Sequence, residues 1–267
     1  MNTWLRAWQR RREARALLRR AIPDELWALT LARLPFLACR SADDLAELRR
    51  LCSLFLDQKE FTGVHGLEVD DAMAVCIAAQ ACLPVLRFGL EPYNGFVGIV
   101  VHPDEAVARR EVIDDDGVVH TYAEVLSGEA MEGGPVMLSW PDVNHAGQSA
   151  EWAYNVVIHE FAHVLDMNDG QADGVPPLAD SVAHEAWSAC IDGEFERFCD
   201  AVDRGADTLL DPYGAEGIDE FFAVAVEAFF VSAAAMRSAH PQLYAMFASF
   251  IGGSVTGIAL INKGDFD

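Results

Sequence analysis

Apolar residues recur at helical spacing through the first third of the chain. This period predicts helices over residues 23–31, 42–55 and 68–83. Ser41 can cap the second helix, and Pro84 follows the third helix at a position where a helix tends to end. We interpret these segments as scaffold.

The pattern changes between residues 84 and 140, where short β-branched or aromatic runs alternate with Gly, Pro, Asn and Asp. This alternation predicts a small sheet with hairpins. The predicted strands are residues 84–88, 95–102, 118–123 and 134–140. The last strand lies shortly before the helix described next. It is therefore the candidate edge strand for adding an extended peptide, although an ordinary core strand would show the same pattern.

The sequence of residues 151–166 predicts a helix, and the other predicted elements are interpreted in relation to it. This segment, EWAYNVVIHEFAHVLD, contains His159, Glu160 and His163 in the pattern H-E-x-x-H. Two histidines four residues apart share one helical face and can bind one Zn²⁺ ion. Glu160 would lie beside the ion, where it can move a proton from a bound water to a leaving amine. Because the surrounding residues are apolar, this polar triplet is costly unless it is paired or binds metal; a hydrogen-bonded polar core helix is the alternative.

Helical spacing returns after a turn-rich stretch at residues 167–177. It predicts helices over residues 180–202, 218–235 and 241–251. No internal repeat or low-complexity linker divides the chain. We therefore expect one α+β domain over residues 1–267, with a basic N-terminal helix at 1–20, a sheet region at 84–140 and a metal-binding helical region at 150–251.

A catalytic zinc ion usually takes three protein ligands and keeps a fourth position for water. Asp169 follows His163 by six residues, but no glycine turn breaks the helix before it. Glu220 is the stronger candidate, because its helix is so apolar that a carboxylate there needs a partner. Glu227 lies seven residues later on the same face. It would then accept a hydrogen bond from a ligating histidine or serve as a structural acid in the core.

Two further candidates follow the histidines directly. Asp166 shares the helical side of His159 and His163, so its carboxylate can accept an imidazole N–H or contact the next loop. Residues 168–175 are acidic and contain glycine, and they form a candidate lid over the site.

Composition restricts the class of function. Hydrophobic residues make up 52% of the 267 residues, which supplies a sizeable core, and the formal net charge is −23. Nucleic acid is an unfavourable partner for such an acidic protein. The first 20 residues are the exception, with seven arginines and one glutamate. This N-terminal segment can lie on an anionic membrane, dock on the acidic remainder of the protein or remain a solvated helix.

The chain shows no secretory signal and no run of about 18 apolar residues that would span a membrane. Its six cysteines are scattered without a C-x-x-C pair. We therefore expect a cytoplasmic protein with buried thiols, without a disulfide framework and without integral membrane association.

Four separate blocks of the sequence agree in order and spacing with a known family. They are HEFAHVLD at 159–166, the predicted strand at 134–140, Asp211-Pro212-Tyr213 and EFFAV at 220–224. In these blocks the chain resembles the Mlc titration factor A family of zinc metallopeptidases. The resemblance implies a zincin core similar to the catalytic domain of anthrax lethal factor, with Glu220 as the third ligand. It also implies that Tyr213 steadies the oxyanion.

These observations lead to two compatible hypotheses. The first is a zinc peptidase with one Zn²⁺ per chain on His159, His163 and Glu220, and with Glu160 as general base. The resemblance adds aminopeptidase-like action on short peptides. The second hypothesis rests on the resemblance alone: a regulatory protein that sequesters a Mlc-type transcriptional repressor and thereby affects sugar uptake through the phosphotransferase system.

Overall fold

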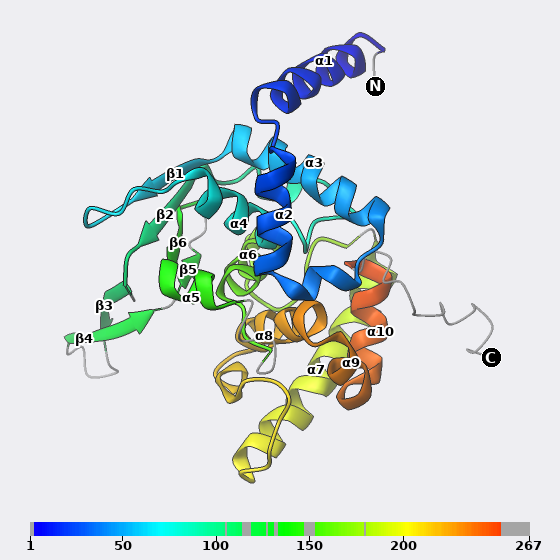
Figure 1. Cartoon of the computed structure of the whole chain (residues 1–267). Coiled ribbons are helices and arrows are strands. Elements are labelled where there is room, and N and C mark those ends of the chain that lie inside the picture. Colours follow the sequence, from blue (N-terminus) through cyan, green and yellow to red (C-terminus); the bar gives the residue numbers. More distant parts are fainter. Residues whose placement is uncertain are drawn as a thin grey trace.

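The computed structural model describes residues 3–104, 106–113, 119–126, 128–130, 133–146, 153–178 and 180–251. A small sheet lies at one side of a larger group of helices, so the fold is α+β as expected (Figure 1). Within these residues, no helix combines the length and the apolar character that crossing a bilayer requires.

A four-stranded sheet lies beside the helix that carries the histidines. Its strand order is β1 (Glu60–Gly63), β2 (Gly98–His102), β6 (Val136–Ser139) and β5 (Gly128–Ala130). The first three strands run parallel, and β5 runs antiparallel to β6. Strand β6 is thus paired on both sides, and the prediction that residues 134–140 form the edge was wrong. Among the described strands, β5 is the edge that contacts this helix.

Several strand predictions were inaccurate. Residues 84–88 form turns, because the amides of Leu86, Phe88 and Gly89 donate to carbonyls three or four residues earlier and are not free for a ladder. Strands β1 and β5 were missed because they are only four and three residues long. An antiparallel pair of β3 (Ala106–Ile113) and β4 (Val119–Leu126) forms a second sheet. The predicted turn at 114–117 lies outside the described residues.

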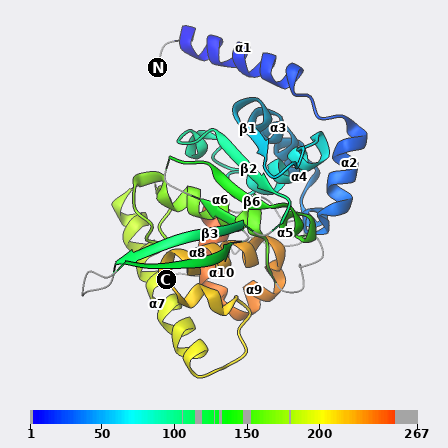
Figure 2. The same cartoon turned by 90° about the vertical axis from the view of Figure 1, so that its left-hand side faces the viewer.

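Four helices form the N-terminal part of the fold. They are α1 (Thr3–Arg19), α2 (Asp24–Arg33), α3 (Ala42–Gln58) and α4 (Asp71–Ala81), with short 3-10 turns η1 (Pro35–Cys39) and η2 (Glu91–Tyr93). Ser41 caps α3 as predicted, because its hydroxyl accepts the amide of Asp44 at 3.1 Å. Helix α1 projects from the top of the molecule (Figures 1 and 2).

The C-terminal part is almost entirely helical. Its elements are α5 (Trp140–His145), α6 (Val156–Asp166), η4 (Met167–Asp169), α7 (Ser181–Asp203), η5 (Pro212–Ala215), α8 (Ile218–Val231), α9 (Ala233–Ala239) and α10 (Pro241–Phe250). The helix predicted over residues 218–235 is interrupted at Ser232.

Helix α6 lies at the centre of the core, in contact with α4, α8 and β5. On its apolar side, the Phe161 ring packs against Phe55, Tyr93 and Phe96, with centroid distances of 5.7, 5.1 and 5.8 Å. Such aromatic contacts fix the rotation of the helix about its axis. The histidine side of α6 is thereby directed towards α8.

The six cysteines all lie within the described residues and form no disulfide bonds. Cys52, Cys76 and Cys82 are buried, whereas Cys39 is exposed and Cys190 and Cys199 are partly buried. The expectation of buried thiols is therefore confirmed for three of them.

Candidate metal centre

Helix α6 begins at Val156, not at residue 151. The side-chain oxygen of Asn155 accepts the amide of Ile158 at 3.0 Å and caps the helix. Ala153, just before the cap, has a φ of 57°, which a right-handed helix does not contain. Glu151 and Trp152 lie outside the described residues. The signal that was missed is an Asn directly before the apolar run.

Asn155 also fixes the start of α6 to a neighbouring helix. Its Nδ2 donates to Oε1 of Gln80 on α4 at 2.8 Å. Both residues are fully buried. The position of the following histidines along α6 is therefore set by a polar contact inside the core.

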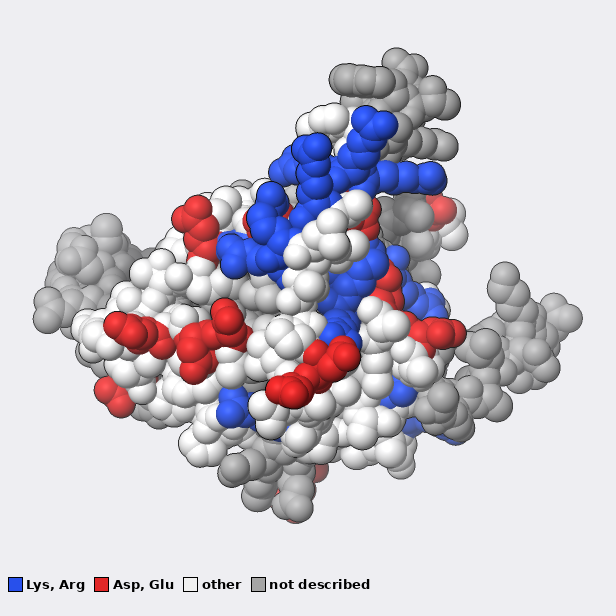
Figure 3. Space-filling view, turned by 45° about the horizontal axis from the view of Figure 1, so that its top comes forward, with Lys and Arg blue, Asp and Glu red and all other residues white. Residues whose placement is uncertain are grey.

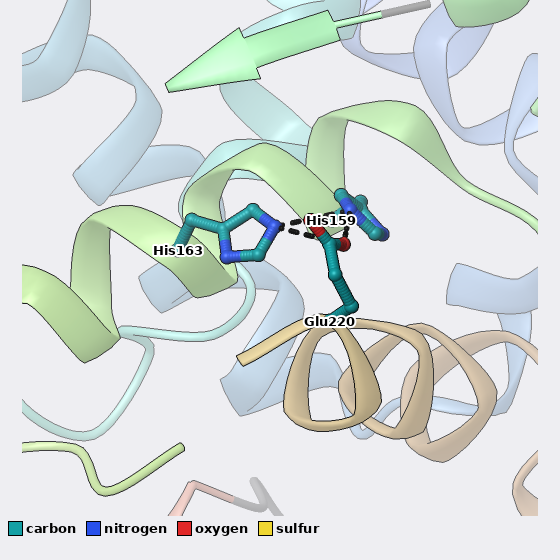
Figure 4. A group of neighbouring side chains, drawn as sticks. All are labelled: His159, His163 and Glu220. Carbon is teal, nitrogen blue, oxygen red and sulfur yellow. Dashed lines mark hydrogen bonds and ion pairs between the residues drawn. The ribbon is translucent and has the colours of Figure 1, made fainter. Parts of the chain in front are cut away.

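Three side chains converge between α6 and α8 (Figure 4). Nε2 of His159 lies 3.1 Å from Oε2 of Glu220, and Nε2 of His163 lies 3.1 Å from Nε2 of His159 and 3.3 Å from the same Glu220 oxygen. Ligands of a tetrahedral zinc ion are about 3.3 Å apart when each is about 2.0–2.2 Å from the metal. This donor set and its spacing therefore fit one zinc ion.

Glu227 orients the first of these histidines. Its Oε1 lies 2.8 Å from Nδ1 of His159, and its Oε2 accepts the backbone N–H of Asn155. The contact at Nδ1 directs Nε2 of His159 towards Glu220. Glu220 and Glu227 both project from α8, about two turns apart.

Tyr213 contributes a phenol to the same group. The side chain of Asp211 accepts the Tyr213 amide at 2.9 Å and starts the short turn η5. The Tyr213 hydroxyl donates to Oε1 of Glu220 at 3.2 Å. Because the Tyr213 side chain is 40% exposed, the phenol lies on the side of the group that solvent and substrate can reach.

Glu160 lies on the other side, against the edge strand. It is buried, and a Cβ atom on Gly128 of β5 would be only 2.4 Å from its Oε1. The β5 backbone can therefore approach the Glu160 carboxylate this closely only at a residue without a side chain. Sequence reasoning missed Gly128, whose signal was a glycine inside a short strand.

The buried charges of the group perturb one another. Burial raises the pKa of Glu160 to about 7, although the two histidines oppose this change. Burial would also raise the pKa of Glu220, but hydrogen bonds from His159 and His163 hold it well below its usual range. Burial alone would lower the pKa of His159, whereas its bonds to Glu220 and Glu227 raise it well above its usual value. Three carboxylates around two imidazoles favour a bound cation.

Asp166 and Asp169 do not join this group. Asp166 is fully buried, but neither of its oxygens has a hydrogen-bond partner within the described residues. Burial raises its pKa to about 7, against the influence of the nearby Gly174 amide. The predicted imidazole contact is therefore made by Glu227 and not by Asp166. Asp169 is exposed, and its Oδ1 accepts the amide of Gln171 at 3.1 Å.

The candidate lid at residues 168–175 is held at both ends. Nδ2 of Asn168 donates to the carbonyl of Pro92 at 2.7 Å, and the Trp187 indole donates to the carbonyl of Gly174 at 2.8 Å. Val175 is buried. These contacts disfavour a lid, because opening would break them.

The fold and the H-E-x-x-H helix together define a metallopeptidase-like protein. Comparison with known proteins gives the family: the chain belongs to the glucose-regulated metallo-peptidase M90 family, whose model matches residues 5–251. Membership in this family implies a metal.

Three relatives illustrate the similarity. An uncharacterized protein of Synechocystis is 34% identical over 229 residues, which cover 85% of this chain and 83% of the relative. Proteins named Mlc titration factor A are 35% identical over 230 residues in Cronobacter sakazakii and 34% identical over 232 residues in Salmonella arizonae. These two alignments cover 85% of this chain and 85% and 90% of the respective relatives. The family resemblance expected from the sequence is thus confirmed.

Proposed function

We propose that the protein is a zinc-dependent peptidase in which His159, His163 and Glu220 hold the ion. The observation that carries this proposal is the approach of their three ligand atoms to within 4.8 Å of one another. When bound, a zinc ion supplies Lewis acidity, which acidifies a coordinated water and polarises a peptide carbonyl.

The protein's own groups perform the remaining tasks. Glu160 accepts a proton from the attacking water and passes it to the leaving amine. Tyr213 donates a hydrogen bond to the carbonyl oxygen as negative charge develops there; this role requires its hydroxyl to leave Glu220 for the substrate. Glu227 keeps a proton on Nδ1 of His159, so that Nε2 presents its lone pair.

The substrate is proposed to be a peptide in extended form. Strand β5, an edge strand among the described strands, lies beside Glu160 at the position of Gly128. A peptide that pairs with this edge would bring a backbone carbonyl next to the general base. Aminopeptidase-like cleavage of short peptides is proposed from the family resemblance.

Substitution of Glu160 by Gln tests the proposal. The variant should retain one zinc ion per chain, because Glu160 is not a ligand, and should lose peptide hydrolysis by about 10²-fold or more. Zinc content and cleavage of a peptide library are measured on wild type, Glu160→Gln and the exposed control Glu216→Gln. Equal cleavage by wild type and Glu160→Gln would refute the assignment.

A second role is supported by the name of the relatives, Mlc titration factor A. We propose that this chain also binds a Mlc-type repressor of its host. A pull-down with that repressor should succeed for wild type and for His159→Ala, if binding does not need the metal centre. Failure of both proteins to capture the repressor would remove this second role.

A further inference from the structure

Helix α1 presents an outer face on which two apolar side chains flank two basic ones. Trp8, Arg11, Arg15 and Leu18 follow one another at intervals of three, four and three residues, which places them on one side of the helix. All four are exposed, with 51% for Trp8 and 83% for Leu18. Ala16, on the opposite side, is buried. These four residues form what we call the outer face of α1.

Two charged side chains of α1 pair with α3, whereas the two arginines of the outer face form no ion pair with the described residues. Glu13 binds Arg50 of α3, and Arg19 binds Asp57 through a bidentate contact of 2.8–2.9 Å. Five further arginines whose side chains are described form no ion pair with a carboxylate of the described residues: Arg10, Arg11, Arg12, Arg15 and Arg20. Figure 3 shows Lys and Arg side chains gathered over this end of the molecule.

We propose that the outer face of α1 docks on the surface of an anionic phospholipid membrane. Guanidinium groups match phosphate oxygens in charge and in hydrogen-bond geometry. Trp8 and Leu18 lie about 15 Å apart along the helix and flank the arginines, so both can enter the headgroup region while the arginines meet phosphates. The face belongs to a single helix that projects from the body, which suits contact with a flat surface (Figures 1 and 2).

The charge of the whole chain sets the orientation on such a surface. The first 20 residues carry +6 in a protein of net charge −23, so the remainder carries −29. An anionic membrane attracts α1 and repels the body, and only the α1 end can approach closely. One Trp and one Leu are too few for permanent anchoring, so the contact is reversible and weakens with salt.

Vesicle co-sedimentation of the full chain tests this docking. The protein should sediment with phosphatidylcholine vesicles that contain about one third phosphatidylglycerol at about 0.05 M salt. It should remain in solution with pure phosphatidylcholine vesicles, or with the anionic vesicles at about 0.5 M salt. Charge reversal in Arg11→Glu/Arg15→Glu should lower the apparent affinity at least about tenfold.

Two controls separate this effect from net charge and from unfolding of α1. Arg87→Glu/Arg237→Glu makes the same change in net charge at exposed positions elsewhere and should change the affinity less than about twofold. Arg11→Lys/Arg15→Lys keeps the charge and should retain binding. The proposal is overturned if the wild-type protein does not bind anionic vesicles at low salt, or if the Arg11→Glu/Arg15→Glu variant binds them as tightly as wild type does. It is also overturned if wild type binds duplex DNA under conditions in which it does not bind vesicles.

Discussion

Glu227 on α8 and His159 on α6 are joined by a hydrogen bond of 2.8 Å between Oε1 and Nδ1. The other oxygen of Glu227 accepts the backbone amide of Asn155, at the start of α6. One carboxylate thus connects the position of the helix with the orientation of its first histidine. Because Glu227 is buried, both contacts are shielded from bulk solvent.

Replacing Glu227 by Gln should weaken zinc binding by about 10–100-fold. The amide can accept only one of the two N–H groups through its oxygen, and its NH₂ then faces the other donor. Competition with a chromophoric chelator measures the affinity, with the exposed Glu216→Gln as control. An affinity within about twofold of wild type would show that Glu227 is only a core acid.

Replacing Gly128 by Ala should lower kcat by at least about tenfold while zinc content and melting temperature stay near wild type. The added Cβ would be 2.4 Å from Oε1 of Glu160, so the carboxylate must move. Gly95→Ala is the matched control, because its Cβ would meet no atom within 4 Å.

The same steric relation predicts coupling between Gly128 and Glu160. In Gly128→Ala/Glu160→Asp the shorter acid makes room for the new methyl group. The loss in kcat should therefore be smaller than the product of the two single losses. Independent, multiplicative losses would argue against direct contact as the cause.

Removing the metal should destabilise the protein, because the ligands join α6 to α8. Dialysis against a chelator lowers the melting temperature, and zinc at about one hundred times its Kd should raise it again by about 5 °C or more. Differential scanning calorimetry measures the shift. His163→Ala should respond to zinc much less, and an equal response would place the stabilising ion elsewhere.

Glu194 makes one part of the stability depend on acid pH. The His240 hydrogen bond of 2.9 Å and the Arg197 contact of 2.6 Å lower the pKa of Glu194 below its usual 4.5, although burial opposes them. A group whose pKa is lower in the folded state than in the unfolded state stabilises the folded protein at pH values above its unfolded-state pKa. This contribution to stability is lost as the pH falls through the folded-state pKa.

Glu194→Gln should accordingly reduce the free energy of unfolding by about 1.5–3 kcal/mol near neutral pH. The difference from wild type should shrink as the pH falls below about 4. Urea unfolding at several pH values checks this, with the exposed Glu196→Gln as control. A difference that does not vary with pH would mean that Glu194 acts through packing.

The long helices could be predicted from sequence because their apolar spacing and caps are local signals. Ser41 at the start of α3 is an example, with its hydroxyl on the Asp44 amide. The convergence of Glu220 with the histidines followed from a different argument, namely that a carboxylate in so apolar a helix needs a partner. The structure brings these side chains together across 61 positions of sequence.

Other features depend on contacts between distant segments and had no such signal. The edge strand β5 has only three residues, so no alternation could identify it. The closeness of Gly128 to Glu160 exists only after β5 pairs with β6 and lies on α6. The Asn155 contact with Gln80 also needs the assembled core, since the two residues are far apart in sequence.

Helix α8 supplies both Glu220 and Glu227 from one rigid rod. A tilt or rotation of α8 would move Glu220 away from the histidines and would at the same time break the hydrogen bond between His159 and Glu227. Ligation by Glu220 and the orientation of His159 by Glu227 therefore depend on the placement of this one helix.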